Sequence, residues 1–348
     1  MRTAALSLLG LILLAACDGT DTEGGGAAAP VVRGVAYVGV SVGDLDAAAR
    51  FYSRAADLEE VARGELKGST ALDGLAGRPG VVARTRMLAS SNAQLRFMQF
   101  ASRPETASAP MVPVNGPGIA HVCYQVAQET RTYERFLDNG ARHVGARDMV
   151  QLNPRNPVLY AYARDPDGIM FEVEHVDVAA LNLETPPQFA YRLRHVALAT
   201  PDIGRLVDFY SALLDQPDPR RLGRFWGLSG DKLDQVSGLE DTRISMAFFQ
   251  IGNLELEIAE YLSHPTELPA APRALDAYGY NMIVLDVTSL EAARQKVIAA
   301  GGTIVSEPEA MDRGQILFAR DPDGNLLGLL TADPASIISP ARFQDRGL

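Results

Sequence analysis

Two histidines and two glutamates, His121, Glu172, His195 and Glu257, are residue types that bind divalent metal ions in proteins. They are divided between two copies of one repeated unit, so that neither copy holds all four. Copy one contains the first pair, and copy two contains the second pair. Where one copy has a ligand, the other has a residue that does not bind metal. The sequence therefore predicts one metal site built across both copies and one site without ligands.

A long internal repeat defines these two copies. The segment VAYVGVSVGDLDAAARFYSRAADL, which starts at Val35, matches LRHVALATPDIGRLVDFYSALLD, which starts at Leu193. A second segment, YARDPDGIMFEV from Tyr162, matches FARDPDGNLLGL from Phe318. The first match has an offset of 158 residues at its Phe-Tyr pair, and the second has an offset of 156 residues. A period this long indicates paired globular domains, because solenoid repeats are about 20 to 50 residues long.

Each copy also reads as two similar halves. Alternating apolar residues predict strands, and Asp44 is placed to cap a helix that follows the first strand. The DPDG tetrapeptides at Asp165 and Asp321 predict tight turns between the last two strands of each copy. We expect four β-α-β-β-β units in all. In copy one these are strands over residues 35–42, 81–88, 93–100, 119–126, 158–164 and 169–175, with helices around Phe51-Tyr52 and over 130–139.

Three motifs in order, HVALATPD early in a copy, HVCYQV in the middle and DPDGxxxE at the end, resemble the vicinal oxygen chelate superfamily. This superfamily includes glyoxalase I, acyl-CoA epimerases, extradiol dioxygenases and antibiotic-binding resistance proteins. The resemblance covers about residues 32 to 332. It implies an α+β fold in which four βαβββ modules form two curved mixed sheets, paired around a metal site.

In that superfamily the metal ligands lie on the first, fourth, fifth and eighth strands of a domain. In this strand order, copy one has Tyr37, Arg96, His121 and Glu172, and copy two has His195, Glu257, Met282 and Gly328. In glyoxalase I-like members the early pair of one domain meets the late pair of its partner, which implies one complete site of two histidines and two glutamates here. Neither copy supplies the two-histidine, one-carboxylate triad of extradiol dioxygenases, which counts against that activity.

The ligand set suits one divalent ion such as Zn, Ni, Co, Mn or Fe(II). By resemblance, such an ion binds vicinal oxygens of a small substrate and stabilises the enediolate formed by proton loss. Glu172 or Glu257 is the expected catalytic proton shuttle. We therefore expect a lyase, isomerase or epimerase of the glyoxalase type. The alternative is a non-enzymatic protein that sequesters a small molecule, as bleomycin-resistance proteins do. A homodimer that completes the site between chains also stays open.

Other residues near these positions have simpler interpretations. Glu174 and Glu255 share the facing of the two predicted glutamate ligands and are the alternative ligands. Cys123 is expected to be a buried structural thiol. Surface positions are expected for the remaining histidines, His143, His175 and His264. Core packing is expected for the repeated aromatic pairs, Phe51-Tyr52 and Phe209-Tyr210. Trp226, next to Phe225, either lines the substrate pocket or lies outside it.

The N-terminal residues predict export and lipidation. An apolar run over residues 4–16 follows Arg2 and is too short to span a bilayer, which takes about 20 residues. The quartet LAAC that ends at Cys17 resembles the lipobox of bacterial lipoproteins, so Cys17 is the expected lipidation site. We expect a lipid-anchored protein of the bacterial cell envelope that faces the periplasm, with Asp18 favouring the inner membrane. Glutathione hemithioacetals and acyl-CoA thioesters are mainly cytoplasmic, so neither is the expected substrate.

The rest of the chain is expected to form two domains. The net charge of −11 argues against nucleic acid as a partner, and membrane contact is expected through the lipid only. With Cys17 acylated, Cys123 is the one remaining thiol and no intramolecular disulfide can form. The expected divisions are a signal peptide at 1–17, a flexible tether at 18–31, domains at 32–178 and 191–332 joined by a linker at 179–190, and a surface tail at 333–348.

Overall fold

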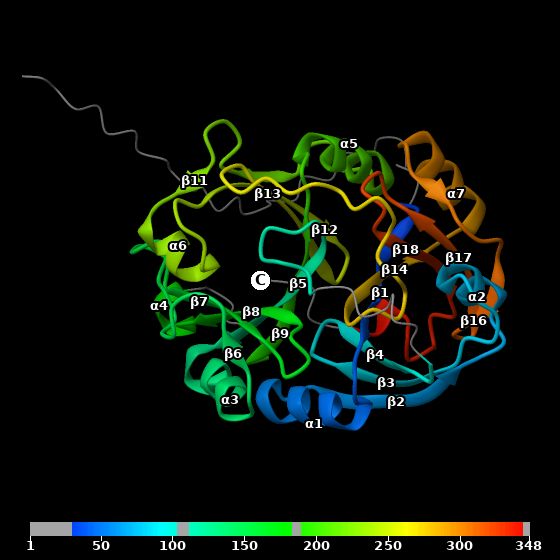
Figure 1. Ribbon diagram of the computed structural model, residues 1–348, viewed down its shortest axis with the longest axis horizontal. Helices are drawn as coiled ribbons and strands as arrows, with labels where there is room; N and C mark the ends of the chain where they lie inside the picture. The colour runs from blue at the N-terminus through cyan, green and yellow to red at the C-terminus, as the bar shows by residue number, and fades with distance from the viewer. Residues whose placement is uncertain (1–29, 103–110, 183–188, 344–348) are drawn as a thin grey trace, which may run out of the picture.

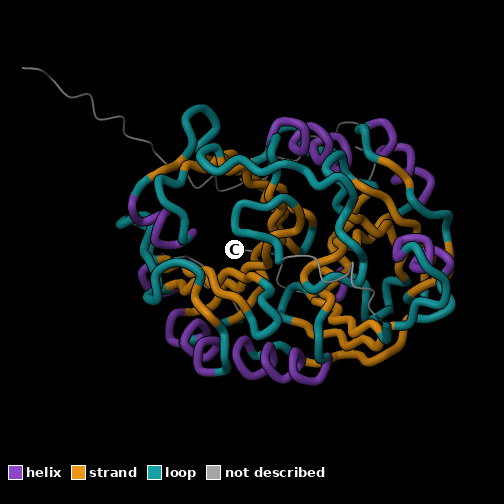
Figure 2. Tube along the Cα trace, viewed as in Figure 1, coloured by secondary structure: helices purple, strands orange, loops and turns teal. Residues whose placement is uncertain are grey.

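The computed structural model describes residues 30–102, 111–182 and 189–343. The predicted signal peptide and most of the predicted tether lie outside these residues. Among the helices of the described ranges, none is long and apolar enough to cross a membrane. The chain forms two curved mixed sheets side by side, with helices at the periphery (Figure 1, Figure 2). This is the α+β architecture of duplicated βαβββ modules that the sequence predicts.

The first sheet, sheet A, combines the early half of copy one with the late half of copy two. Its two central strands, one from each copy, run antiparallel to one another. In spatial order its strands are β15 (Thr303–Ile304), β17 (Gly314–Arg320), β18 (Leu326–Ala332), β14 (Gly279–Val287), β1 (Val32–Ser41), β4 (Gln94–Phe100), β3 (Ala83–Ala89) and β2 (Glu59–Leu66), with β16 (Glu309–Met311) paired to β17.

The second sheet, sheet B, has the complementary composition, with the late half of copy one and the early half of copy two. Its central strands, again one from each copy, are also antiparallel. In spatial order its strands are β10 (Arg220–Leu222), β12 (Arg243–Ile251), β13 (Leu254–Tyr261), β9 (Tyr191–Ala199), β5 (Gly118–Ala127), β8 (Met170–Val176), β7 (Val158–Arg164) and β6 (Arg142–His143), with β11 (Leu228–Ser229) paired to β12. Each sheet therefore brings together residues that lie far apart in the sequence.

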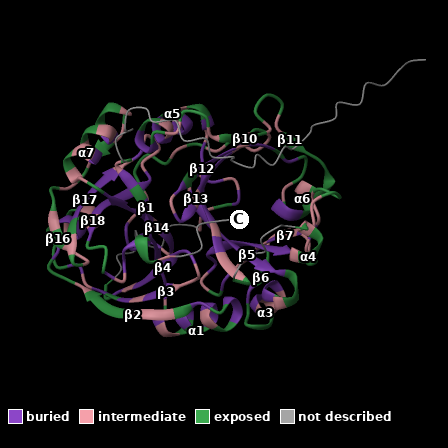
Figure 3. Cartoon of the chain, turned by 180° about the vertical axis from the view of Figure 1, so that it is seen from behind, coloured by how far each residue is buried: buried purple, intermediate pink, exposed green. Residues whose placement is uncertain are grey.

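The helices cover the outer faces of the sheets, whose strands are mostly buried (Figure 3). As the sequence predicts, the Asp44 carboxylate caps the first long helix by accepting hydrogen bonds from two backbone N–H groups. Asp202 caps the matching helix of copy two. The helices are α1 (Leu45–Ala56), α2 (Thr70–Ala76), α3 (Thr132–Asp138), α4 (Val178–Leu181), α5 (Ile203–Leu214), α6 (Asp231–Ser237) and α7 (Leu290–Ala299), with short 3-10 turns η2 (Gln128–Thr130) and η3 (Pro340–Arg342).

The repeated Phe-Tyr pairs lie in the core, as predicted, and their tyrosines also make a matched polar contact. The Tyr52 hydroxyl donates to the Asp165 carboxylate at 2.9 Å, and the Tyr210 hydroxyl donates to Asp321 at 3.0 Å. Burial raises the pKa of Asp165 to about 7 and that of Asp321 to about 6. In each copy this contact ties a helix on one sheet to the DPDG turn of the other sheet.

The C-terminal segment differs from the expectation of a surface tail. Ile338 is buried in the apolar core of sheet A, and the Gln94 side-chain amide donates to the carbonyls of Ile337 and Ile338, each at 3.2 Å. The surface assignment is therefore wrong for this stretch. The apolar pair Ile337-Ile338 is too short to show the spacing of a buried strand or helix in the sequence. Its burial is seen only in the structure, where the segment packs against β1 and β4.

Candidate metal centre

The four predicted ligands lie on four adjacent strands of sheet B. Glu257 is on β13, His195 on β9, His121 on β5 and Glu172 on β8, which are neighbours in that order. Ala197 of β9 is the register partner of both His121 and Glu257, while Glu172 pairs with Cys123, two residues after His121. Strand alternation then directs all four side chains to one face of the sheet.

The side chains meet at one point. The Nε2 atoms of His121 and His195 are 3.2 Å apart. The Glu172 Oε2 atom is 3.4 Å from His121 Nε2 and 3.0 Å from His195 Nε2. The Glu257 Oε2 atom is 3.4 Å from His195 Nε2. The early pair of copy two thus lies beside the late pair of copy one. His121, Glu172 and His195 form the tightest group, and Glu257 joins it through His195.

The donor set fits a divalent cation. Ligand atoms about 2.1 Å from a shared ion lie about 3.0 to 3.4 Å apart at octahedral or tetrahedral angles, which matches the observed separations. All four residues are buried. Both histidine rings turn Nε2 toward the centre, and their Nδ1 atoms are buried with no hydrogen-bond partner among the described residues.

The electrostatics of the centre favour positive charge. Burial favours the neutral ring of His195, but Glu257 and Glu172 outweigh burial and raise the pKa of this histidine. Burial also opposes ionisation of Glu172, but the contacts with both histidines outweigh it and lower its pKa. Two carboxylates and two imidazole nitrogens thus form an acceptor-lined centre. Such a centre holds a proton or a metal cation in the same place.

Both alternative glutamate ligands form ion pairs with arginines. The Arg194 guanidinium forms an ion pair with Glu174 and another with Glu255 at 3.2 Å, and Arg220 also contacts Glu255 at 3.3 Å. Cys123 is buried, as predicted, and burial followed by the charge of Glu172 raises the pKa of its thiol. Cys123, Glu172 and Glu174 also form a second buried group whose potential ligand atoms lie within 4.8 Å of one another.

The counterparts of the four ligands lie in sheet A and form no metal centre. Tyr37 on β1 and Arg96 on β4 contact each other, with the Arg96 Nη1 atom donating to the Tyr37 hydroxyl at 2.9 Å. Both side chains also bind the carboxylate of Asp312. Gly328 has no side chain to offer, and Met282 has a thioether, which is a weak ligand for these ions. An ion-paired arginine thus occupies the place that a glutamate has in sheet B.

The structure corrects one of the remaining expectations, on His175, and decides another that the sequence left open, on Trp226. His143 is exposed and His264 is half-buried, but His175 is only 3% exposed and its Nε2 accepts a hydrogen bond from the backbone N–H of Tyr133. The surface assignment of His175 is therefore wrong. Trp226 is 86% exposed on the loop between β10 and β11, as is its neighbour Phe225 at 80%, so neither lines the centre.

Two aromatic residues beside the centre were not found from the sequence. Tyr162 is the register partner of Glu172, and its ring centroid is 5.0 Å from that of His121. Phe248 is the register partner of Glu257, and its ring centroid is 6.4 Å from that of His195. The sequence signal for both was the side-chain alternation along β7 and β12, the strands that pair with those of the two glutamates. Both rings lie beside the ligands, and Tyr162 also brings a buried hydroxyl that contacts Tyr261.

Comparison with known proteins identifies the family. The sequence profile of the Glyoxalase/Bleomycin resistance protein/Dioxygenase superfamily matches residues 34–173 and again residues 192–329. The chain therefore belongs to this superfamily and contains two copies of its domain. No curated protein matches the sequence.

Solved structures are similar in fold over most of the chain. Glyoxalase I from Zea mays is 18% identical, with 85% of this chain and 91% of that chain covered and a TM-score of 0.57. A putative dioxygenase from Bacillus subtilis is 12% identical, with 91% and 90% covered and a TM-score of 0.56. At these identities the similarity concerns the fold alone.

Proposed function

We propose that this protein is a divalent-metal-dependent enzyme of the glyoxalase type, a lyase, isomerase or epimerase that acts on a small oxygenated molecule. The observation that supports this proposal is the convergence of His121, Glu172, His195 and Glu257 on one buried point in sheet B. Membership of a superfamily that includes glyoxalases is consistent with it. The metal identity and the substrate are parts of the proposal.

The four residues would hold one divalent ion. When bound, such a cation supplies Lewis acidity, which polarises substrate oxygens and makes the adjacent C–H bond more acidic. The histidines contribute neutral donors that leave the ion electrophilic, and the two carboxylates balance its charge. The rings of Tyr162 and Phe248 lie beside the ligands, where they exclude water and strengthen the interactions inside.

Among the two glutamates, the contacts favour Glu257 as the proton shuttle. Glu172 contacts both histidines through Oε2, whereas Glu257 contacts only His195, at 3.4 Å. The carboxylate with fewer contacts is freer to turn toward a substrate carbon and accept its proton. Glu257→Gln should keep the fold and abolish exchange of the substrate α-proton with solvent, while Glu172→Gln should chiefly weaken metal retention. Proton exchange that survives in Glu257→Gln would assign the shuttle to Glu172.

Metal content tests the centre directly. Elemental analysis of purified protein should give about one divalent ion per chain for the wild type and a large loss for His121→Ala and for Glu257→Ala. The matched control is Met282→Ala, which truncates the sheet A counterpart of His121 and should leave the metal content unchanged. Circular dichroism checks that each variant is folded. Unchanged occupancy in both sheet B variants would refute the site.

Turnover separates an enzyme from a binding protein. A panel of α-hydroxycarbonyl compounds should show metal-dependent conversion that is lost with EDTA and restored by a divalent ion. A melting temperature that is unchanged by EDTA but rises with hydrophobic ligands would instead support the sequestration alternative. Loss of the fold on chelation, with no turnover of any compound, would indicate a structural metal.

We also propose that the chain is lipid-anchored through Cys17 in the cell envelope, with two domains at 32–178 and 191–332 joined by a linker at 179–190. The LAAC quartet supports the anchor, and Cys17 lies outside the described residues. Labelling of expressing cells with a fatty-acid probe should mark the wild type and not Cys17→Ser. Equal labelling of both would contradict the anchor.

A further inference from the structure

The centre of sheet A lies in the same place as the metal centre of sheet B but has the opposite character. Arg96 and Tyr37 direct N–H and O–H donors into it, and both side chains are buried. A donor-lined centre recognises anions, as an acceptor-lined centre recognises cations. We propose that sheet A contains a second binding site, for small organic carboxylates, in which the side chain of Asp312 now takes the position of the ligand carboxylate.

The contacts of Asp312 are those of a bound carboxylate. Its Oδ2 atom accepts hydrogen bonds from Arg96 Nη1 at 2.6 Å and from the Tyr37 hydroxyl at 2.9 Å, and its Oδ1 atom pairs with Arg96 Nη2. The two oxygens therefore receive the two-pronged contact that a guanidinium gives to any carboxylate. The Arg96 guanidinium also stacks on the Tyr37 ring, 4.6 Å from its centroid, which fixes the donors in place.

Space for the rest of a ligand lies beside this contact. A cavity of about 650 Å³ is lined by Arg96 and Asp312, by Thr85 of β3, by the segment from the end of β2 to the start of α2, and by β16. The other charged residues of the lining are already paired: Lys67 with Glu65, and Glu309 with the Ser69 hydroxyl. This volume is in the range of small-molecule sites. Thr85 lies two residues before Met87, the register partner of Arg96, so its hydroxyl faces the same side as the guanidinium. The Thr85 hydroxyl is placed to contact a hydroxyl group of the ligand, and the Lys67–Glu65 pair adds no net charge to the cavity.

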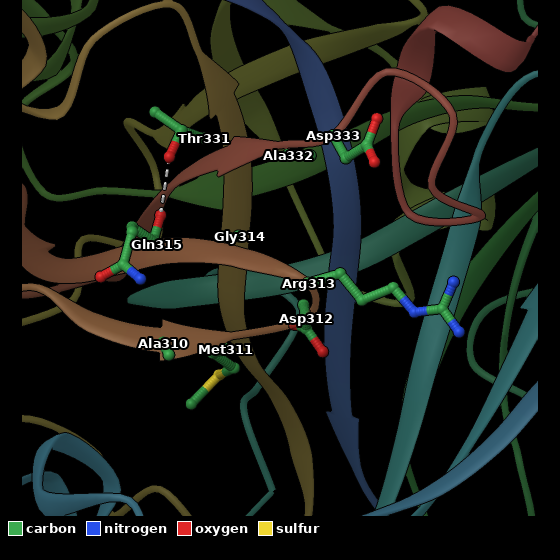
Figure 4. A pocket seen from close by; sticks show the side chains of 9 residues that line it. All are labelled: Ala310, Met311, Asp312, Arg313, Gly314, Gln315, Thr331, Ala332 and Asp333. Carbon is green, nitrogen blue, oxygen red and sulfur yellow. Dashed lines mark hydrogen bonds between the residues drawn. The ribbon is translucent and has the colours of Figure 1, made fainter.

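A short hairpin turn carries Asp312. It lies in the two-residue turn between β16 and β17, where Asp312 and Arg313 both have positive φ values of 56° and 59°. β16 is a three-residue strand that pairs with β17, and its Glu309 accepts hydrogen bonds from the Ser69 hydroxyl and the Ala71 backbone N–H. The rearrangement that admits a ligand is therefore confined to the turn itself. Figure 4 shows the Asp312 and Arg313 side chains leaving the turn in different directions, with Arg313 extended away from it. Arg313 is exposed.

Exchange of one carboxylate for another preserves the charge balance at Arg96. Removing Asp312 with no replacement would leave a buried guanidinium without a counter-ion, which is strongly unfavourable. A ligand carboxylate that binds Arg96 as the turn swings out avoids this cost. The turn therefore acts as a tethered competitor, and ligand affinity is set by the difference between two similar contacts.

The experiment uses thermal shift and isothermal titration calorimetry with acetate, lactate and malate as probes. Acetamide and sodium chloride serve as uncharged and ionic controls. The wild type should show saturable stabilisation by the hydroxy acids, and Asp312→Ala should bind them at least tenfold more tightly because the competitor is gone. The matched control, Glu59→Gln, removes a charge from exposed β2 outside the cavity lining and should change the affinity less than twofold.

Two further variants locate the binding. Arg96→Lys keeps the positive charge but loses the two-pronged guanidinium contact, so the affinity for the hydroxy acids should fall at least tenfold. This variant replaces Arg96→Met if Arg96→Met does not fold. His121→Ala, which disrupts the sheet B centre, should keep the effect, so failure of the metal proposal leaves this one intact. Absence of a saturable response in the wild type overturns the site, even where Asp312→Ala responds. An equal response to acetamide, or one that persists in Arg96→Lys, also overturns it.

Discussion

Sheets A and B place different chemistry at one position of the same fold. In sheet B two glutamates and two histidines line the centre with acceptors, and in sheet A an arginine and a tyrosine line it with donors. Each centre takes its early residues from one copy and its late residues from the other. A change in one copy therefore alters half of each centre, and the two sheets can diverge while the backbone stays alike.

The comparison also shows two ways to stabilise buried charge. Sheet B carries two carboxylates whose balance comes from protons on histidine or from a cation. Sheet A carries its own balance, because Asp312 neutralises Arg96. Sheet B should therefore depend on metal for stability, and sheet A should not.

Metal removal should have the largest effect. At a free metal concentration about 1,000 times the dissociation constant, binding to the native state contributes about 4 kcal/mol to the free energy of unfolding. Treatment with EDTA should remove this contribution and abolish turnover, as followed by urea unfolding and by activity. His121→Ala should unfold at the same urea concentration with and without EDTA. If EDTA changes neither the urea unfolding nor the activity of the wild type, sheet B balances its charge without a metal.

Arg96→Met tests the internal balance of sheet A. The change leaves the Asp312 carboxylate buried beside Tyr37 without its cation, so the free energy of unfolding should fall by about 3 kcal/mol. Adding Asp312→Asn should restore part of this loss because no unpaired charge then remains. Urea unfolding measures both variants. Metal content should stay at the wild-type value in each, and a loss of metal would show that the two centres are coupled.

The sequence allowed the fold and the grouping of the four candidate ligands to be predicted because both depend on local patterns. The strand alternation around His121 and the spacing from the DPDG glycine to Glu172 are fixed within a few residues, and the repeat supplies the matching positions of copy two. β2 was not recognised because it is an edge strand with exposed and half-buried residues and no clear apolar alternation. Segments without regular apolar spacing could not be assigned to a strand or helix from the sequence.

Asp312 could not be predicted for a different physical reason. It lies 216 residues from Arg96 and reaches it only because β17 joins sheet A and its hairpin turn points toward β1 and β4. The residues before the second strand match have no aligned counterpart in copy one, so the repeat gave no guide. Long-range placement of a turn depends on how the sheet closes, and a sequence motif does not record it.

Gly328→Ala probes how far sheet A has departed from sheet B. A Cβ atom at this position would lie 2.9 Å from Val284 Cγ2 and 3.1 Å from Ile316 Cδ1, so the free energy of unfolding should fall by about 2 kcal/mol. Its counterpart in sheet B is the much larger Glu172. Gly74→Ala is the control, because a Cβ there meets nothing within 4 Å inside α2. If Gly328→Ala leaves the free energy of unfolding unchanged, sheet A has room for a metal-binding side chain at this position.

The two DPDG turns offer the finest comparison, through their pH dependence. Asp165 has a pKa of about 7 in the folded protein against an ordinary 3.8, so the folded state binds the proton that the unfolded state has released between these values. Its contribution to stability is full at low pH and is lost as the pH rises through 7. Between pH 6 and 7 the free energy of unfolding should fall by about 1 kcal/mol through this group.

Asp321 should contribute less over the same interval, about 0.3 kcal/mol, because its pKa is about 6. The Asn325 side chain donates to Asp321 at 2.8 Å, whereas copy one has Ile169 at the matching position. Urea unfolding at pH 6 and pH 7 should therefore show a flatter pH dependence for Asp165→Asn than for Asp321→Asn. Equal slopes in the two variants would mean that this one amide does not distinguish the turns. Asn325→Ile should raise the slope of copy two toward that of copy one.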